Sequence, residues 1–297
     1  MTTDAVVSGE RRVQHERRVE RSRRTLELLL DTVFRPGHWA ASLSYALGLQ
    51  GRIQVSTSII GAGDGARRAR PLRVAFASDF HAGATTDSRM LARACEALAE
   101  LQPDVLLLGG DFVSVRASYV HRLAPLIAGI PAPFGKFAVL GNHDLRANRA
   151  EVIAALEDAG VTMVANRSVS LAAPFERVTI SGLDDPTRGR PRADWSEAKA
   201  EPGATRIVLM HSPDGLHAIG DRPFDLAVCG HTHGGQVTLP NGTALVVPSG
   251  TLSRRFCRGV FRLGEGARTL LVSRGVGCST IPVRLFAAPE VHLCLIT

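Results

Sequence analysis

Short apolar segments alternate with amphipathic ones along most of the chain, from about residue 71 onward. Five apolar segments have the length and composition of buried strands: Leu72–Ala77, Asp104–Leu108, Lys136–Leu140, Arg206–Met210 and Asp225–Cys229. Apolar positions between them recur every three or four residues, which predicts two helices: Leu91, Ala94, Cys95, Leu98 and Leu101 in one, and Val152, Ile153, Leu156 and Ala159 in the other. This alternation of strands and helices predicts an α/β fold.

The pattern changes after His233. Strand-like runs follow one another closely there, separated by Gly and Pro: Gln236–Leu239, Thr243–Val247, Thr269–Ser273 and Val291–Ile296. We expect these runs to build a second, more antiparallel half of the fold. No segment has the ~20 consecutive apolar residues that a spanning helix needs, so no transmembrane helix is predicted.

The first 70 residues form a region of different composition. Residues 1–24 are polar and rich in arginine, and the next ten predict a helix with one apolar face: Leu26, Leu29, Leu30, Val33 and Phe34. Pro36 and Gly37 end this helix, a weaker helical stretch follows over residues 39–49, and Gly61–Arg70 is typical of a linker. We therefore expect a partly helical, basic extension over residues 1–70 and a main domain over residues 71–297.

Three interpretations of this extension differ in what the helix contacts. The sequence at Ser22–Leu26 is similar to a twin-arginine export signal, but Glu27 and Asp31 interrupt the region that should be uncharged, so we do not expect export. A basic amphipathic segment over residues 10–50 is suited to an anionic membrane surface. Alternatively, the helix docks its apolar face on the main domain. The residues leave these last two alternatives open.

Charge and cysteine usage narrow the class of protein. The net charge of +7 lies mainly in residues 1–70, which hold 12 arginines and 7 acidic residues, against 23 basic and 21 acidic residues in the rest. A nearly neutral main domain argues against a nucleic-acid partner, because nucleic-acid binders spread basic surface over the folded domain. The cysteines are odd in number and form no C-x-x-C pair, which predicts reduced, buried thiols in the cytoplasm: Cys95, Cys229, Cys257, Cys278 and Cys294.

Polar side chains that are able to bind metal or phosphate follow each of the five strands predicted first. They lie in Asp79-Phe80-His81, Gly109-Gly110-Asp111, Gly141-Asn142-His143-Asp144, His211 and Gly230-His231-Thr232-His233. The carboxyl ends of strands line the ligand crevice of an open α/β sheet, so we expect these groups to converge. Seven of them offer carboxylate, imidazole or amide donors suited to Mn, Fe or Zn, enough for two ions that share one carboxylate: Asp79, His81, Asp111, Asn142, His211, His231 and His233.

These five blocks, in this order, resemble the calcineurin-like metallophosphoesterase superfamily. The resemblance covers Leu72 to Thr297. Its later part is similar to a bacterial branch of phosphodiesterases and UDP-2,3-diacylglucosamine pyrophosphatases, through Gly230–Gln236 (GHTHGGQ), Ser273–Gly275 and Pro282–Glu290. Members of that branch commonly begin with a membrane anchor or export signal, and this chain departs from them in having only the basic amphipathic segment.

The resemblance implies a four-layer sandwich, in which two packed mixed β-sheets are flanked by helices, with an N-terminal helical extension. It also implies two divalent ions, Mn first and Fe, Zn or a mixed pair as alternatives. It assigns the seven ligands to two ions bridged by Asp111: Asp79, His81, Asp111 and His233 for the first, and Asn142, His211 and His231 to complete the second. A hydroxide shared by both ions would attack phosphorus in line. His143 would neutralise phosphoryl charge or protonate the leaving oxygen, with Asp144 orienting its ring.

The charge of such a centre favours a particular kind of phosphoester. Two divalent ions, two aspartates and a hydroxide leave a charge of about +1. A diester or pyrophosphate, with one negative charge per phosphorus, balances this better than a dianionic monoester does. We therefore expect a small-molecule or lipid-linked phosphoester substrate. Arg274 and Arg284 are candidates for contact with its phosphate or with a lipid head group, or alternatively for surface salt bridges.

Two other functions stay open. A nuclease or cyclic-nucleotide phosphodiesterase is the alternative within the class, although 5% aromatic residues offer poor material for stacking bases. A non-catalytic metal-binding scaffold is the alternative from another class, although every motif is intact. The oligomeric state does not follow from the sequence.

Overall fold

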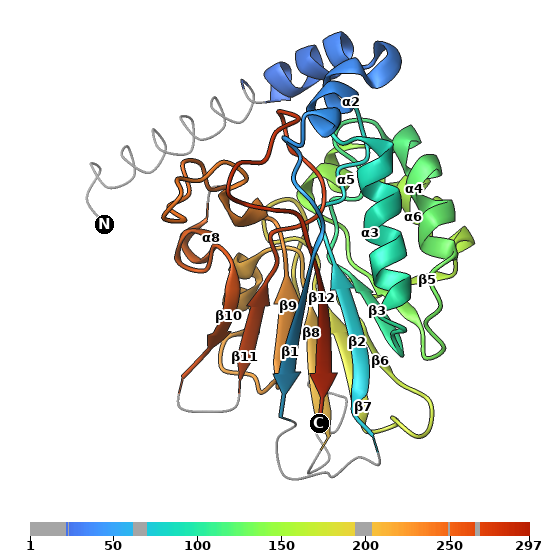
Figure 1. Cartoon of the computed structure of the whole chain (residues 1–297). Helices are drawn as coiled ribbons and strands as arrows, with labels where there is room; N and C mark the ends of the chain where they lie inside the picture. The colour runs from blue at the N-terminus through green and yellow to red at the C-terminus, as the bar shows by residue number, and fades with distance from the viewer. Residues whose placement is uncertain (1–21, 23, 62–69, 194–203, 249, 265–267) are drawn as a thin grey trace, which may run out of the picture.

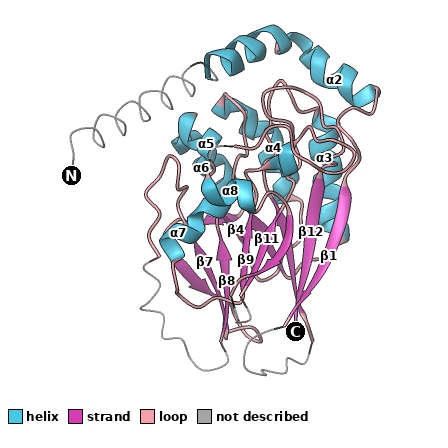
Figure 2. Cartoon of the chain, turned by 90° about the vertical axis from the view of Figure 1, so that its left-hand side faces the viewer, coloured by secondary structure: helices cyan, strands magenta, loops and turns pink. Residues whose placement is uncertain are grey.

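Two six-stranded mixed sheets pack face to face at the centre of the molecule, and helices lie on their outer faces (Figure 1; Figure 2). The architecture is the α/β sandwich that the sequence predicts. The structure is a computed structural model, and it describes residues 22, 24–61, 70–193, 204–248, 250–264 and 268–297. The arginine-rich residues 1–21 and most of the expected linker, residues 62–69, lie outside the described part.

The first sheet carries the longer helices. Its strand order is β1 (Gln54–Ile60), β12 (Glu290–Ile296), β2 (Leu72–Ala77), β3 (Val105–Leu108), β4 (Lys136–Ala138) and β5 (Val161–Met163). The strands β2 to β5 are parallel, whereas β12 runs antiparallel to β2. Its outer face is covered by α3 (Ser88–Glu100), α4 (Val120–Ala128) and α6 (Arg149–Asp158). The helix α3 begins where the Asp87 carboxylate accepts a hydrogen bond from the Arg89 amide at 2.9 Å.

The second sheet is built around a parallel centre. Its strand order is β10 (Gly259–Arg262), β11 (Thr269–Val272), β9 (Leu226–Cys229), β8 (Thr205–Leu209), β7 (Val178–Gly182) and β6 (Ser168–Ser170). The two edge strands, β6 and β10, run antiparallel to their neighbours. Two short helices pack near its outer face, α7 (Leu216–Ile219) and α8 (Thr251–Arg255).

The central strands are continuous apolar runs because both faces of the sheets are buried there. In β2, Val74 and Phe76 face the second sheet, whereas Ala75 and Ala77 face the helices. Successive side chains of a strand point to opposite faces, so a strand covered on both sides needs apolar residues at every position. The five strands predicted first from the sequence are thereby confirmed, each to within a few residues.

We expected the chain after His233 to build a second half of the fold, and this prediction is wrong. Its strands β10 and β11 complete the second sheet, and β12 inserts into the first sheet between β1 and β2. The segments Gln236–Leu239 and Thr243–Val247 are not strands. They make only isolated bridges, Val237 with Leu285 and Thr238 with Ala244, because they form a loop above the sheets and not part of a ladder.

The N-terminal helix (24–34) and α2 (Trp39–Ala46) lie over the carboxyl ends of the parallel strands (Figure 1). The N-terminal helix docks through its acidic face. Asp31 is 3% exposed and accepts a hydrogen bond from Arg116 at 2.7 Å, and Glu27 is 6% exposed and lies 3.6 Å from Arg146. Docking through the predicted apolar face is therefore wrong, because Leu26, Leu29 and Val33 are exposed and Leu30 and Phe34 are only half-buried. Within the described residues, no helix has the length and hydropathy to cross a bilayer.

Candidate metal centre

The loops after five parallel strands meet at one place, as the sequence predicts. These strands are β2, β3 and β4 of the first sheet and β8 and β9 of the second. Six of the seven predicted ligands fall into groups whose donor atoms all lie within 4.8 Å of one another: Asp79, His81 and His233 in one, His81 and Asp111 with His143 in a second, and Asp111, His211 and His231 in a third. All of these side chains are buried. The convergence arises from topology, because they span more than 150 positions of sequence.

The first group lies at the end of β2. The Nε2 atoms of His81 and His233 are 3.0 Å apart, and Nε2 of His233 is 3.6 Å from Oδ1 of Asp79. The Asp79 carboxylate is fixed from behind, because it accepts hydrogen bonds from the Ser78 hydroxyl at 2.6 Å and from the His231 amide at 3.0 Å. Both histidine nitrogens therefore face one carboxylate oxygen whose position is set by the backbone.

The third group, with His211 and His231, joins the two sheets. Nε2 of His211 lies 3.0 Å from Nδ1 of His231 and 3.1 Å from Oδ1 of Asn142. The other ring nitrogen of His211 donates to the carbonyl oxygen of Gly109 at 2.8 Å, which leaves Nε2 without its proton in the neutral ring. Asn142, the seventh predicted ligand, thus reaches the same group through its amide oxygen.

Asp111 lies between the group of Asp79, His81 and His233 and the group of His211, His231 and Asn142. Its Oδ2 atom is 3.5 Å from Nε2 of His81 and 3.4 Å from Nε2 of His211. Its other oxygen accepts a hydrogen bond from the His143 amide at 2.8 Å, which holds the carboxylate in place. One carboxylate oxygen is therefore shared by donor groups that come from different sheets.

Five of the seven predicted ligands have a left-handed backbone, which a side chain normally disfavours. Their φ angles are 54° for Asp79, 44° for His81, 54° for Asp111, 72° for His231 and 54° for His233. Such strained residues cluster at functional sites, where the surrounding structure holds them. The strain turns each side chain sharply out of its strand end and toward the centre of the site.

Two glycines allow the carboxylates to approach the backbone closely. A Cβ atom on Gly141 would collide with Oδ1 of Asp111, and a Cβ atom on Gly230 would collide with Oδ2 of Asp79. These are the glycines of the G-N-H-D and G-H-T-H blocks. Both motifs therefore need glycine for a steric reason.

Burial and charge set the protonation states of the site. Burial lowers the pKa of His81 to about 4 and holds the pKa of His233 well below its ordinary value. Burial also raises the pKa of Asp79 to about 6. Burial would raise the pKa of Asp111 too, but the adjacent His211 lowers it well below its ordinary value, so this carboxylate is ionised. Burial would lower the pKa of His211, but the adjacent Asp111 raises it well above the ordinary value of a histidine. The neutral imidazoles of His81 and His233 and the ionised carboxylate of Asp111 are forms that bind metal, and His211 must release its proton to join them.

The donor set fits divalent cations. Imidazole nitrogens, carboxylates and one amide oxygen converge in a buried space, and such mixed N and O sites accept Mn, Fe or Zn. The Nε2 atoms of His81 and His233 lie 3.0 Å apart, so both can reach one cation. The seven residues are therefore chemically suited to hold metal ions.

The ring of His143 is held by Ser114. Nδ1 of His143 donates to the carbonyl oxygen of Ser114 at 2.7 Å. Asp144 does not hold this ring, which corrects the role that the resemblance implies. The oxygens of Asp144 instead accept hydrogen bonds from the Val113 amide at 3.1 Å and the Gly141 amide at 3.0 Å, so this carboxyl shapes the loops. Sequence analysis missed Ser114, because it acts through a backbone carbonyl that no motif records.

The two candidate arginines lie beside the site with their donors engaged. Arg284 is 3% exposed and donates to the carbonyl oxygens of Gly277 and Ala287, with Nη2 also 3.2 Å from Nδ1 of His233. Arg274 binds Glu290 at 3.0 Å and Gln54 at 2.8 Å. Their observed partners are therefore protein groups.

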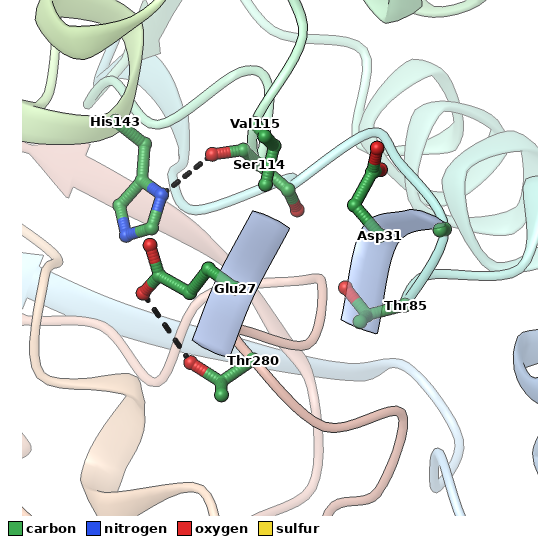
Figure 3. A pocket seen from close by; sticks show the side chains of 8 residues that line it. Glu27, Asp31, Thr85, Ser114, Val115, His143 and Thr280 are labelled. Carbon is green, nitrogen blue, oxygen red and sulfur yellow. Dashed lines mark hydrogen bonds between the residues drawn. The ribbon is translucent and has the colours of Figure 1, made fainter. Parts of the chain in front are cut away.

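A small cavity lies between the N-terminal helix and His143 (Figure 3). Glu27 and Asp31 line it from the helix, and Ser114, His143 and Thr280 line it from the main domain. Figure 3 shows the Glu27 side chain pointing toward the His143 ring, with its carboxylate accepting a hydrogen bond from Thr280 at 3.4 Å. Sequence analysis did not place Glu27 near the site, because its contact depends on which face of the helix docks.

The chain belongs to the calcineurin-like phosphoesterase family, whose model matches residues 72–235. It is a hydrolase of this metallophosphoesterase class. The match spans all five motif blocks and ends just after His233. The resemblance noted from the motifs is thereby confirmed.

Several curated bacterial proteins are similar to this chain. It is 32% identical to the phosphodiesterase YaeI of Escherichia coli over 76% of this chain and 82% of that protein. It is 32% identical to the uncharacterized metallophosphoesterase YkuE of Bacillus subtilis over 65% of this chain and 67% of that protein. It is 26% identical to the UDP-2,3-diacylglucosamine pyrophosphatase LpxG of Chlamydia trachomatis over 75% of this chain and 82% of that protein.

Proposed function

We propose that this protein is a dinuclear metal-dependent hydrolase of a phosphodiester or pyrophosphate. The observation that carries the proposal is the position of Asp111, whose Oδ2 atom lies 3.5 Å from His81 on one side and 3.4 Å from His211 on the other. A shared carboxylate between two groups of N and O donors is the arrangement that two-ion phosphoester hydrolysis needs.

Two divalent ions, with manganese first, would be held by seven residues that share Asp111: Asp79, His81, Asp111 and His233 for one ion, and Asn142, His211 and His231 to complete the other. Bound there, the ions supply Lewis-acid polarisation of the phosphoryl group and activation of the attacking water. Because the carboxylates and imidazoles are fixed, they would determine the positions of the ions and therefore the position of the phosphoryl group. Because the donor atoms are buried and held by backbone hydrogen bonds, little reorganisation accompanies the reaction.

His143 is the proposed proton donor to the leaving oxygen. Its Nδ1 proton is committed to the Ser114 carbonyl oxygen, so Nε2 is the atom that exchanges a proton with substrate. Burial holds the pKa of this ring well below its ordinary value, so the ring is neutral in the free protein and Nε2 must take up the proton that it passes to the leaving oxygen. Asp144 supports the loop that carries His143 through its bonds to Val113 and Gly141.

A diester or pyrophosphate fits the charge of the site better than a monoester does. Two divalent ions with two aspartates and a hydroxide leave about +1, which a monoanionic linkage balances. Relatives named as a phosphodiesterase and as a UDP-2,3-diacylglucosamine pyrophosphatase support the same two linkages, the second on a lipid-linked substrate. A nuclease stays the second candidate within the class.

We also propose that the protein works at the inner face of the cytoplasmic membrane. The N-terminal helix turns Leu26, Leu29 and Val33 outward, each about half exposed or more, and arginines flank this face at Arg24 and Arg35. Apolar residues bordered by arginines favour the boundary of an anionic bilayer. The five unpaired cysteines support a reducing compartment.

Comparison of four substrates tests the proposed reaction. The manganese-loaded protein and its Asp111→Asn variant are assayed with bis(4-nitrophenyl) phosphate, UDP-2,3-diacylglucosamine, 4-nitrophenyl phosphate and single-stranded DNA. We expect turnover of one or both of the first two, at least about tenfold slower turnover of the monoester, and loss of turnover in the variant. Faster hydrolysis of the monoester or of DNA would reject the proposed substrate class.

A further inference from the structure

An apolar pocket opens directly beside His233. It has a volume of about 310 Å³ and lies between the loop after β9 and the loop before β12. Its walls include His233, Gln236, Val237, Val246, Pro248 and Ile281. This volume is at the lower end of the range of about 300–1,000 Å³ that is typical of small-molecule sites. The pocket therefore begins at a member of the candidate metal centre and leads away from it.

The residues that line the pocket favour an uncharged group in the part of a ligand that enters it. Apart from His233, no lining residue is charged or ionisable. The amide of Gln236 is already engaged, since it donates to the carbonyl oxygens of Ser279 at 3.0 Å and Ile281 at 3.2 Å and accepts from the Ser279 amide at 2.7 Å. Gln236 thus ties the two loops together and offers no free group to a ligand. A second phosphate or a nucleoside diphosphate would find no cationic partner in this pocket.

The outer rim of the pocket is apolar as well. Val246 is 69% exposed and Ile281 is 43% exposed, and the neighbouring Leu245 and Phe286 are also exposed. A chain that leaves the pocket would therefore meet further apolar surface. The rim also continues toward the N-terminal helix, because Thr280 lines both this pocket and the cavity under Glu27.

We propose that this pocket binds an alkyl or acyl chain of the phosphoester substrate while the phosphorus is held at the metal centre. The proposal rests on the proposed function, because the phosphoryl group must lie beside His233. It makes the enzyme selective for amphiphilic phosphoesters. Burial of each added methylene then strengthens binding by about twofold to fourfold, until the pocket is filled.

Calorimetric titration with alkylphosphonates tests this assignment. The manganese-loaded full chain is titrated with methylphosphonate, butylphosphonate and octylphosphonate, which share one head group and differ in chain length. We expect affinity to rise by about tenfold or more from methyl to butyl. In Val246→Asp, a charge at the pocket wall should reduce this rise to less than about twofold. Val260→Asp is the matched control, because Val260 is also exposed, at 50%, but lies on β10 away from the pocket.

The outcomes separate this inference from the proposed function. Equal affinity for the three phosphonates would overturn the pocket assignment, as would a rise that survives in Val246→Asp. Absence of any phosphonate binding by a protein that hydrolyses bis(4-nitrophenyl) phosphate would also overturn it, but would leave the proposed function standing. Absence of both binding and hydrolysis would reject the two together.

Discussion

The Nδ1 atom of His143 lies 2.7 Å from the carbonyl oxygen of Ser114. The Ser114 hydroxyl also donates to the carbonyl oxygen of His81 at 3.1 Å, so one loop residue positions two histidines of the site. This contact fixes the proton of the neutral His143 ring on Nδ1 and leaves Nε2 for proton exchange. In the proposed mechanism, His143 therefore exchanges a proton with substrate, whereas the other histidines of the site bind metal.

Replacement of His143 should separate chemistry from metal binding. We expect His143→Gln to lower kcat by about 10²-fold to 10⁴-fold with bound metal unchanged, because in the proposed reaction the ring donates a proton and the proposed ligand set is complete without it. Steady-state kinetics and metal analysis of the same sample measure both quantities. The control is His121→Gln, which changes an exposed histidine paired with Glu151 at 3.3 Å. Equal activity in the two variants would argue against this role.

The close approach of Asp111 to Gly141 predicts a steric effect on metal affinity. In Gly141→Ala, the new methyl group would collide with Oδ1 of Asp111 and displace the shared carboxylate. We expect metal affinity to fall by about 10-fold to 100-fold, measured by competition with a chelator. Gly129→Ala is the matched control, because Gly129 has a helical φ of −70° and the nearest atom to its new Cβ would be 3.6 Å away. Unchanged affinity in Gly141→Ala would show that the carboxylate has room to move.

Glu290 should make stability depend on pH. Burial alone would raise its pKa, but the His292 ring 3.0 Å away and hydrogen bonds from Arg274 and Ser56 hold the pKa well below its ordinary value. Unfolded chains therefore bind the proton more readily than the folded protein, so the stabilisation is present above a pH of about 4.3 and is lost as the pH falls below it.

Urea unfolding of Glu290→Gln at two pH values measures this contribution. We expect the free energy of unfolding of the variant to be about 1–3 kcal/mol lower than that of wild type at pH 7, and the difference to be smaller at pH 3.5. Glu96→Gln is the control, because Glu96 is exposed in a surface pair with Arg93 and should change stability by less than about 0.5 kcal/mol. A loss that is the same at both pH values would contradict an ionised Glu290.

The outward leucines of the N-terminal helix predict binding to anionic vesicles. Leu29→Asp should lower the affinity for phosphatidylglycerol-containing vesicles by about tenfold in a co-sedimentation assay, since it removes a 60% exposed apolar side chain from the outward face of the helix and adds a negative charge. Ile59→Asp is the matched control at a 70% exposed position on the edge strand β1. Equal binding by the two variants would mean that the helix does not contact the bilayer.

The parts of the fold that the sequence predicted are those with a strong periodic signal. The helices α3 and α6 and the strands from β2 to β9 that precede the motif blocks have long apolar patterns. The strand β1 was missed because Gln54–Ile60 contains Ser and Thr and is mostly exposed at the edge of its sheet. Its pairing is instead determined by β12, which is more than 200 residues away in sequence.

The candidate site was also predicted only in part from the sequence. Strand ends and motif order were enough to predict that Asp79, Asp111 and His211 converge, because parallel topology brings strand ends together. Contacts made by backbone atoms, such as Ser114 with His143, leave no trace in residue type. The docking face of the N-terminal helix was also open, because its apolar stripe suits either a protein core or a bilayer. The ion pairs of Glu27 and Asp31 show that the helix docks on the domain through its acidic face.

Titration of the metal-free protein with manganese, followed by the rate of bis(4-nitrophenyl) phosphate hydrolysis, tests the shared role of Asp111 most directly. The account predicts that the rate rises until two equivalents of manganese per chain are bound and then stays constant, and that Asp111→Asn shows no such rise. Saturation at one equivalent, or full activity of Asp111→Asn, would contradict a centre in which two ions share this carboxylate.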